Sequence, residues 1–508
     1  MRRTTPSPDG RRGFVLLVVL VVVALLALTC YEFADRTVND RLAVARKTQL
    51  AQARAAALSG VDYVLAMASD PEFDPLLAMA EPEQFVGVPV TEDGRVAFTV
   101  FDPAYPSDAD FAVNGLGSEL GKINLNALAE SDLDEADARE MLINVPGFDE
   151  SIADTVLDFI DADAEPRPFG TETDDDGVPV RNLPLDSLDD LLALPEIDAT
   201  LLYGEDANRN GVLDPSENDG DASAPPDNAD GYLDPGLQRW VTVYGREASV
   251  TPDGWPRINV NADDVDTMAA DVSQEFGEAM GQYMLAVRNM GQQQGGSGGG
   301  GQQQQQQPGS PEELGRQIAT DILFGPEQTD PLEGSYYTGG EIRSLTQLIV
   351  TEVQDADGTP LPNFSTLSAE DIDRMYSVLA LSDAPTIAGR IDLNAAPLEV
   401  LLGLPGFDEA RAQQVFDGQG TWNSPMALFA EGAAPLELIE KIEPIVTTGT
   451  RTFRFSSVGY VEGGPMVRVD AVVDAAQWPP RILELTDLSR LGVGYDAGRV
   501  RPEVVTEE

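Results

Sequence analysis

The N-terminus of the chain constrains its fold more than any other stretch. Residues 14–30 form the uncharged run FVLLVVLVVVALLALTC, and the only four arginines before it are at positions 2, 3, 11 and 12. Seventeen residues lie at the short end of the length that crosses a bilayer as a helix. Because basic residues stay on the cytoplasmic side, we expect everything after Cys30 to lie across the membrane.

The helical pattern continues well past this run. Apolar residues recur at spacings of three and four, at Leu50, Ala53, Ala57, Val61, Val64 and Ala68. No proline interrupts the pattern before Pro71. A cleaved secretory signal would instead end at small residues and release a new domain. The pattern predicts one helix over residues 14–68, roughly 80 Å long, half in lipid and half in water.

Composition excludes several classes of function. The 508 residues include 87 acidic and 32 basic residues, a formal net charge of −55, and no histidine. Nucleic-acid binding needs a cationic surface, and the absence of histidine excludes a Ser-His-Asp triad and an ordinary zinc site. The single cysteine, Cys30, lies in the membrane segment, so the exported part has no disulfide. We expect no enzyme.

Strand patterns lie near both ends of the remaining chain. Residues 85–90, the turn TEDG and residues 95–102 predict a hairpin, with Val96, Phe98 and Val100 on one face. Residues 451–461 and 464–475 predict two further strands joined by a Gly-Gly turn. A long helix laid on a small antiparallel sheet, with a large α-helical insertion, is therefore the expected α+β fold.

The expected insertion contains an internal repeat. KINLNA starts at Lys122, RINVNA at Arg257 and RIDLNA at Arg390, and each copy has an Asn that can cap the following helix. Val-Pro-Gly-Phe at residues 145–148 and Leu-Pro-Gly-Phe at residues 404–407 each separate two short amphipathic helices, and a partial copy starts at Leu191. These stretches resemble the helix-hairpin-helix motif.

That motif usually binds DNA phosphates, and membrane-anchored DNA receptors of competence systems carry it. Here carboxylates flank the hairpins, at Asp149, Glu150, Asp154 and Asp158 in one and at Asp408 and Glu409 in the other, and only Arg411 is favourable. Because carboxylates repel phosphate, we interpret the hairpins as structural helix pairs and expect no nucleic-acid partner.

The most specific chemical signal is DANRNGVLDPSE at residues 206–217. It matches D-x-[DN]-x-[DN]-G-x5-E at every defined position. The predicted ligands are Asp206, Asn208, Asn210, the carbonyl of Val212, Asp214 and Glu217. Because calcium prefers six to eight oxygen ligands, the sequence predicts an EF-hand-like calcium loop; an acidic turn without a metal is the alternative.

A weaker second loop follows the first. Asn228, Asp230 and Asp234 match positions 3, 5 and 9, but Pro226 occupies position 1 and no glutamate closes the loop. Asp219 or Asp221 is the candidate replacement ligand. This loop is a possible second metal site.

A helix is expected over Val265–Met290, followed by a disordered Gly/Gln-rich linker at residues 291–312. The complete expected organisation is a leader (1–13), the long helix (14–68), the first part of the sheet (69–125), the insertion with its calcium loops (126–240), a strand and helix with the second repeat (241–290), the linker (291–312), a helical region with the third repeat (313–445) and the C-terminal strands (446–508).

These features together resemble a known family. A short basic leader ending at Gly13, followed by Phe14 and a long half-apolar helix, is similar to the class III signal of type IV pilins and pseudopilins. The resemblance implies that prepilin peptidase cuts between Gly13 and Phe14 and that Phe14 is then methylated. Val18 stands where most of that family has glutamate, a difference shared by the minor pseudopilins of the general secretion pathway protein K family of the type II secretion system.

The protein K resemblance implies a function as well as a fold. Members cap the tip of the pseudopilus, help initiate its assembly and bind calcium in the helical insertion. The implied partners are the I and J minor pseudopilins, with contacts to the outer-membrane secretin or to cargo. The implied location is the inner membrane, with the head in the periplasm.

Four alternatives stay open. The N-terminal segment is alternatively a plain signal anchor, or a lipoprotein signal acylated at Cys30, although Ala27-Leu28-Thr29 fits such a site poorly. The whole chain is alternatively a membrane-anchored periplasmic DNA receptor, or a calcium-dependent surface or hydrolytic protein.

Overall fold

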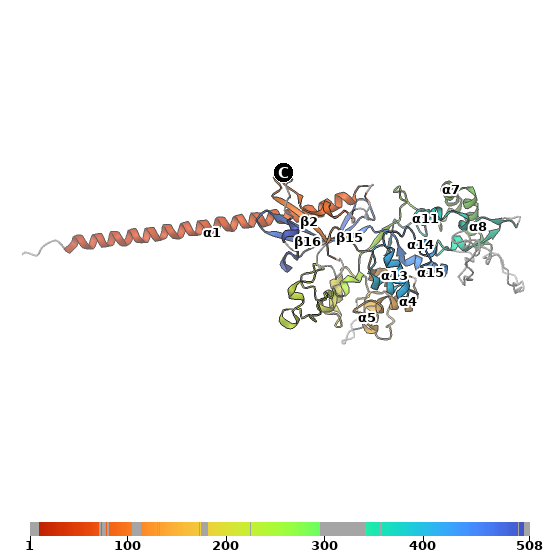
Figure 1. Ribbon diagram of the computed structural model, residues 1–508, viewed down its shortest axis with the longest axis horizontal. Coiled ribbons are helices and arrows are strands. Elements are labelled where there is room, and N and C mark those ends of the chain that lie inside the picture. The colour runs from red at the N-terminus through yellow and green to blue at the C-terminus, as the bar shows by residue number, and fades with distance from the viewer. Residues whose placement is uncertain are drawn as a thin grey trace, which may run out of the picture.

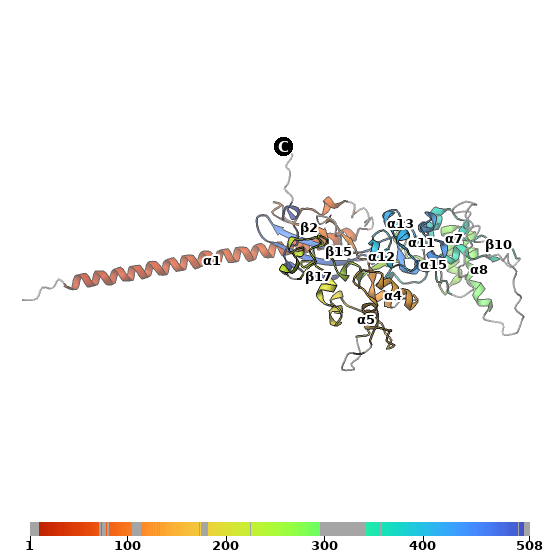
Figure 2. The same ribbon diagram turned by 60° about the horizontal axis from the view of Figure 1, so that its bottom comes forward.

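The long N-terminal helix forms a stalk and the rest of the chain a broad head (Figure 1). The structure is a computed structural model that describes residues 10–501 except 71–72, 74–77, 79–80, 104–112, 130, 132, 172, 174–180, 224, 295–340, 355–357 and 496. A sheet packs on the end of the stalk helix, and a group of short helices lies beyond the sheet (Figures 1 and 2).

Helix α1 (Gly10–Ala68) confirms the predicted continuous helix. From residue 16 to residue 52 it is almost entirely exposed, and Ala53 is the first buried residue after residue 16. Of the predicted apolar stripe, only Leu50 stays exposed, while Val61 and Val64 are fully buried. By length and composition, α1 can cross a membrane.

Two glycines let α1 approach the sheet closely. A Cβ at Gly60 would lie 2.1 Å from the Ser457 hydroxyl, and a Cβ at Gly459 would lie 2.1 Å from the carbonyl of Ala53. These distances are too short for any larger side chain. Helix and sheet are therefore in direct backbone contact.

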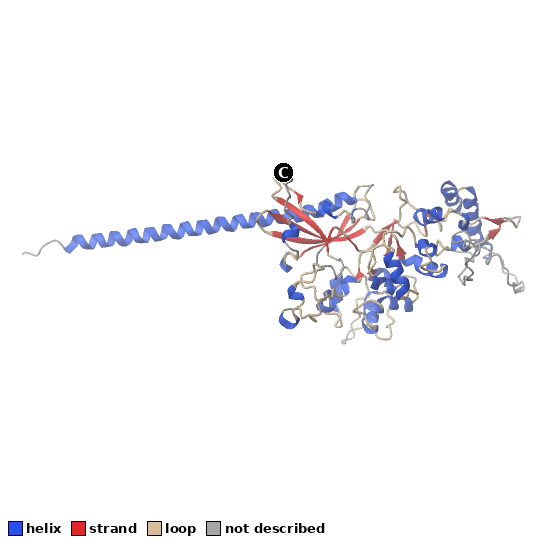
Figure 3. Ribbon diagram, in the orientation of Figure 1, coloured by secondary structure: helices blue, strands red, loops and turns tan. Residues whose placement is uncertain are grey.

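Both ends of the chain build the sheet, which has the order β1-β2-β15-β16-β17 (Figure 3). The strands are β1 (Val88–Pro89), β2 (Val96–Asp102), β15 (Thr452–Val461), β16 (Met466–Asp474) and β17 (Arg481–Asp487), with β3 (Val113–Asn114) beside β2 and β4 (Gly117–Ser118) beside β15. Neighbours in the main order are antiparallel, and Gly459 of β15 lies opposite Phe98 of β2. The predicted hairpin and C-terminal strands are confirmed, whereas β17 was not predicted.

The two faces of the sheet belong to different cores. Phe98, Phe453 and Phe455 pack with the buried alanines and valines of α1. On the opposite face, Phe101 and Tyr495 stack at 4.0 Å. Val212 of the insertion packs against this second core.

The insertion is built from short helices around one large core. These helices are α3 (Leu125–Ala129), α4 (Glu135–Ile143), α5 (Glu150–Ile160), α6 (Ala199–Tyr203), α7 (Val265–Phe276), α8 (Glu278–Gln294), α10 (Gln347–Val350), α11 (Ala369–Val378), α12 (Leu398–Gly403), α13 (Glu409–Asp417), α14 (Pro425–Ala430) and α15 (Leu436–Ile442). Helix α16 (Ala497–Val500) lies near the C-terminus. The 3-10 helices are η1 (Pro82–Phe85), η2 (Leu188–Ala193), η3 (Pro215–Glu217), η4 (Gly220–Ala222), η5 (Leu237–Arg239), η6 (Phe364–Thr366), η7 (Glu443–Ile445) and η8 (Ser489–Leu491).

The three repeat copies adopt the same local structure. Each copy begins with a two-residue strand that pairs in parallel: β5 (Ile123–Asn124) with β6 (Val241–Thr242), β8 (Ile258–Asn259) with β11 (Leu379–Ala380), and β13 (Ile391–Asp392) with β14 (Val446–Thr447). Two further small pairs are β7 (Arg246–Ala248) with β12 (Thr386–Ala388), and β9 (Val353–Gln354) with β10 (Pro360–Leu361).

The Asn at the fifth position of each copy joins a distant segment. The amides of Asn126, Asn261 and Asn394 each donate to a backbone carbonyl and accept a backbone N–H, at Leu185, Ile342 and Trp422 respectively. Each amide thus forms two hydrogen bonds with the backbone of one residue, as a residue of a neighbouring strand would. The predicted capping role holds for Asn124, whose Oδ1 accepts the N–H of Ala127 at 3.2 Å.

Part of the predicted organisation differs from the structure. The helix expected over Val265–Met290 is two helices, because the chain turns at Gly277 with a φ of +94°. The turn lets α7 and α8 pack against each other. Nearly all of the predicted Gly/Gln-rich linker lies outside the described residues.

Candidate metal centre and adjoining pocket

The predicted processing site lies in the first turns of α1. Helical backbone runs through Gly13 and Phe14, while residues 1–9 lie outside the described part of the chain. Cys30 is exposed on the same helix. Cleavage and methylation therefore stay predictions.

The six predicted calcium ligands form one tight loop between α6 and η3. Asp206, Asn210 and Glu217 are 4%, 1% and 3% exposed. The Asp206 carboxylate accepts the backbone N–H groups of Asn210 at 3.0 Å and Gly211 at 2.8 Å. Gly211 has a φ of +71°, and a Cβ there would lie 2.2 Å from the carbonyl of Pro103. The loop therefore needs the glycine that the motif predicts.

Two buried oxygens of this loop lack a hydrogen-bond donor among the described residues. They are Oδ1 of Asn208 and Oε1 of Glu217. Burial, together with the charges of Asp206 and Asp214, raises the pKa of Glu217 to about 7. Burial also raises the pKa of Asp206. A bound cation would satisfy the free oxygens and favour the ionised carboxylates.

The chemistry of the donor set fits calcium, provided that neutral oxygens take part. In the described part of the chain, no three His, Cys, Asp or Glu side chains by themselves form a metal-binding group. The amide nitrogens of Asn208 and Asn210 now donate to Asp214, at 2.6 and 3.1 Å. Turning both amides over would present their oxygens instead, and an all-oxygen set suits a hard cation.

Residues near the C-terminus hold this loop against the sheet. Asn210 donates to the carbonyl of Gly494. Arg468 of β16 is fully buried and donates to the carbonyl of Arg209 at 2.8 Å. Sequence analysis missed both contacts, since the partners are more than 250 positions apart and no local pattern connects them.

The second acidic loop is more open. Asp230 and Asp234 are exposed, and a Cβ on Gly231 would meet no atom within 4 Å. The buried carboxylate of Glu205 accepts the N–H of Asn228 at 3.0 Å and that of Asp234 at 3.4 Å. Glu205, which the motif did not include, thus fastens this loop to the first.

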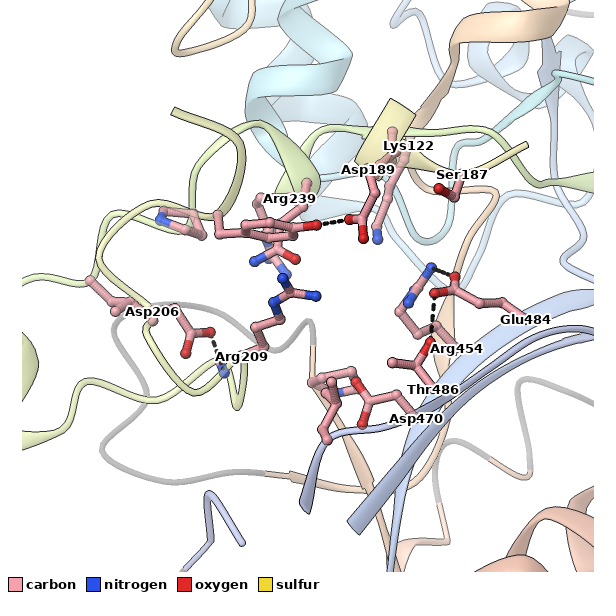
Figure 4. A pocket seen from close by; sticks show the side chains of 18 residues that line it. Lys122, Ser187, Asp189, Asp206, Arg209, Arg239, Arg454, Asp470, Glu484 and Thr486 are labelled. Atoms are coloured by element: carbon pink, nitrogen blue, oxygen red, sulfur yellow. Dashed lines mark hydrogen bonds and ion pairs between the residues drawn. The ribbon is translucent and has the colours of Figure 1, made fainter. Parts of the chain in front are cut away.

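A cavity of about 100 Å³ lies between the metal loop, the start of η2 and the sheet (Figure 4). Lys122, Arg209, Arg239 and Arg454 line it, as do Asp189, Asp206, Asp470 and Glu484. Both Lys122 and Arg454 bind the buried carboxylate of Glu119, at 3.0 and 2.7 Å. These two ion pairs hold the pKa of Glu119 at about 2, despite its burial.

A leucine side chain packs close to the glycine at each hairpin tip. Gly147 and Gly406 have φ values of +89° and +77°, and a Cβ on them would lie 2.7 Å from Leu237 and 2.9 Å from Leu438. Arg411 donates to the carbonyls of Gly406 and Ala433, at 2.5 and 2.9 Å. Both glycines are nevertheless exposed.

The charge argument made from the sequence needs a correction. Asp154 and Asp158 do not surround the first hairpin tip as free carboxylates, because both are fully buried. Asp154 pairs with Arg139 at 2.5 Å and Asp158 pairs with Arg167 at 2.6 Å. The exposed carboxylates of Asp149 and Glu150 remain beside this tip and still disfavour a DNA phosphate there.

The fold and the sites define a pilin-like protein with a large helical insertion and a candidate calcium loop. Residues 121–203 match the family model described as type II secretion system (T2SS), protein K. This match confirms the family resemblance that the sequence suggested, across the first repeat and its hairpin. It ends just before Asp206, so it does not extend to the metal loop.

No curated protein matches the chain. Among solved structures, the chain is similar to one in "The Crystal Structure of the GspK-GspI-GspJ complex from enterotoxigenic Escherichia coli Type 2 Secretion System". The alignment covers 85% of this chain and 96% of that chain, at 12% identity and a TM-score of 0.27.

Proposed function

We propose that this chain is a minor pseudopilin that caps the tip of the type II secretion pseudopilus and helps to initiate its assembly. The observation that carries the proposal is the position of the insertion. The helices lie beyond the end of the sheet, on the side away from the membrane end of α1 (Figure 1). In a fibre of stacked helix-and-sheet subunits, this is the space that the next subunit would occupy.

The membrane helix supports the same position. Val18 provides no carboxylate where most pseudopilins have glutamate. A carboxylate in lipid is costly unless it is paired, and its partner in such fibres is the terminal amine of a neighbouring subunit. A subunit with no neighbour above it can omit this group. The proposed role is structural, without catalysis.

The proposal includes location and partners. Cleavage by prepilin peptidase after Gly13 would leave α1 in the inner membrane and the head in the periplasm. The proposed neighbours are the I and J minor pseudopilins, and the exposed head would contact the secretin or cargo. The protein K family match over residues 121–203 supports this assignment.

Labelling of assembled fibres tests the tip position. A C-terminal epitope on this chain, detected by immunogold electron microscopy, should mark one end of each fibre. The same epitope on the major shaft subunit is the control and should mark the whole length. Regular labelling along the shaft by this chain would refute the proposal, and so would its absence from fibres.

We also propose that calcium binds the loop of residues 206–217. The support is the all-oxygen donor set and the two unsatisfied oxygens, on Asn208 and Glu217. When bound, the ion would supply a positive charge that fixes the loop. Because the loop contacts Arg468 and Gly494, calcium would also stabilise the junction between insertion and sheet.

Thermal unfolding of the detergent-solubilised full chain tests the calcium site. Calcium at 100 times its dissociation constant should add about 2.7 kcal/mol of stability over the chelated protein. Glu217→Gln should lose this increment, whereas Glu431→Gln, at an exposed site elsewhere, should keep it. An equal calcium effect in both variants would contradict the assignment.

A further inference from the structure

The cavity beside the metal loop contains two arginines without a carboxylate partner. Arg209 and Arg239 line it, and within the described residues neither makes an ion pair or a side-chain hydrogen bond. Arg209 is nevertheless half-buried, and burial lowers its pKa. In a chain with 87 acidic residues, such unpaired guanidinium groups need an explanation.

The Arg209 side chain is held in place from one side. Its guanidinium carbon lies 3.5 Å from the centre of the Tyr203 ring, and the Tyr203 hydroxyl donates to Asp189. Stacking uses the face of the guanidinium group and leaves its N–H edge free. In Figure 4, this side chain projects into the space between the loop of Asp206 and the strands. The arrangement orients donors toward the cavity.

The remaining charges around the cavity are largely engaged. Glu484 pairs with Arg454 at 3.0 Å, and Asp470 with Arg468 at 3.3 Å. Asp206 accepts backbone amides of its own loop. Asp189 accepts the Tyr203 hydroxyl. Among the described residues that line the cavity, the cations without an ion-pair partner are thus Arg209 and Arg239.

Size and charge restrict the ligand. The volume of about 100 Å³ holds several water molecules but no nucleotide, since typical ligand pockets start near 300 Å³. The nearby carboxylates Asp189, Asp470 and Glu484 would repel a dianion about twice as strongly as a monoanion. A guanidinium edge matches the planar geometry of a carboxylate.

We propose that this cavity is a binding site for a single carboxylate group, which accepts hydrogen bonds from Arg209 and Arg239. The carboxylate belongs either to a small organic acid or to an acidic side chain of another protein. The site does not depend on the role of the chain in secretion. It lies next to the metal loop, but neither arginine is one of the predicted calcium ligands.

Weak carboxylate binding can be measured by ¹⁹F NMR line broadening of trifluoroacetate. The experiment uses the detergent-solubilised full chain with saturating calcium, at ionic strength held constant with chloride. The wild type should broaden the line, and acetate should reverse the broadening by competition. Arg209→Gln and Arg239→Gln should each weaken binding about tenfold, the effect of one charge-assisted hydrogen bond.

The controls separate this site from general charge effects. Arg490→Gln removes an exposed arginine that does not line the cavity and should bind like the wild type. Arg209→Lys keeps the charge without the planar fork and should give an intermediate affinity. An unchanged calcium titration in each variant verifies that the adjacent loop is intact.

Competition experiments show which kind of molecule supplies the carboxylate group. If N-acetyl-glutamate amide competes as well as acetate, the cavity is open to a protein side chain; if only acetate competes, the ligand is a small acid. Absence of broadening by the wild type would overturn the proposal. Equal broadening by all variants, or stronger competition by phosphate than by acetate, would overturn it as well.

Discussion

The first and third copies of the repeat share one backbone arrangement but differ at a buried position. In the first copy, the amide of Asn124 donates to the carbonyl of Tyr244 at 2.8 Å. In the third copy, Asp392 stands at this position and is fully buried. Its Oδ1 accepts the N–H of Asn394 at 2.9 Å, but its Oδ2 has no partner among the described residues. The two copies thus share a backbone arrangement but differ in the chemistry of one buried side chain.

The difference gives the third copy an ionisable group that the first lacks. Burial raises the pKa of Asp392 to about 7, and the charge of Glu247 contributes to the increase. The folded state therefore binds more protons than the unfolded state between pH 3.8 and about 7. Stability falls as the pH rises through this window.

The largest expected effect is the loss of this pH dependence. Between pH 4 and pH 7 the wild type should lose up to about 4 kcal/mol of stability through Asp392, at 1.36 kcal/mol per pKa unit. Asp392→Asn should remove this part of the profile and leave the contribution of Glu217, and Asn124→Asp should add a similar slope through the first copy. Thermal unfolding midpoints across pH measure both. An equal slope in the wild type and in Asp392→Asn would contradict the assignment.

The second largest effect concerns the Asn residues that join distant segments. Asn394 donates to the carbonyls of Trp422 and Thr448 and accepts the N–H groups of Gly420 and Trp422. Asn394→Ala should cost about 3 kcal/mol, because four backbone groups lose their partner.

The matched change in the first copy should cost less. Within the described residues, the Asn126 side chain forms hydrogen bonds only with Leu185, to its carbonyl and from its N–H. Asn126→Ala should therefore cost about 2 kcal/mol. Amide hydrogen exchange at Trp422 and Leu185 reports each local loss. Equal costs would mean that the two copies do not differ in this contact.

A smaller effect should come from the hairpin glycines, which are similar in both copies. Gly147→Ala and Gly406→Ala should each cost about 2 kcal/mol, because the positive φ is strained and the new methyl group would clash with Leu237 or Leu438. Gly432→Ala is the control. It has a φ of +69° with nothing within 4 Å and should cost only about 1 kcal/mol.

The smallest expected effect is on DNA binding. Electrophoretic mobility of short duplex DNA at low salt should not change on addition of the full chain, with or without Gly406→Ala. The reason is that the exposed carboxylates of Asp408 and Glu409 lie beside the second hairpin tip and repel phosphate. A shift that Gly406→Ala abolishes would restore the DNA-receptor alternative.

Local patterns predicted most of the fold. The charge and apolar pattern predicted α1 to its end at Ala68, and alternation predicted β2, β15 and β16. Each copy of the repeat and each Pro-Gly hairpin is a contiguous stretch of the chain, so both could be recognised from the sequence. The ligands of the metal loop were predicted as a set for the same reason, since residues 206–217 are contiguous.

What the sequence did not reveal depends on long-range contacts. Strand β17 mixes charged and apolar residues and is defined by its pairing with β16. No local sequence pattern predicts the contact between Asn210 and Gly494. Nor does any local pattern indicate that Arg209, a non-ligand position in the metal loop, reaches a cavity shared with the sheet.

The pairing of β2 with β15 also sets the order of events during synthesis. Gly459 lies opposite Phe98, so the ribosome must add several hundred residues after β2 before its neighbour exists. At 5–20 residues per second this wait is roughly 20–70 s. During that time the nascent anchor can already occupy the membrane while a bare strand edge is exposed. Prematurely terminated products would keep this edge unpaired, so a complete sheet requires translation to the last strands.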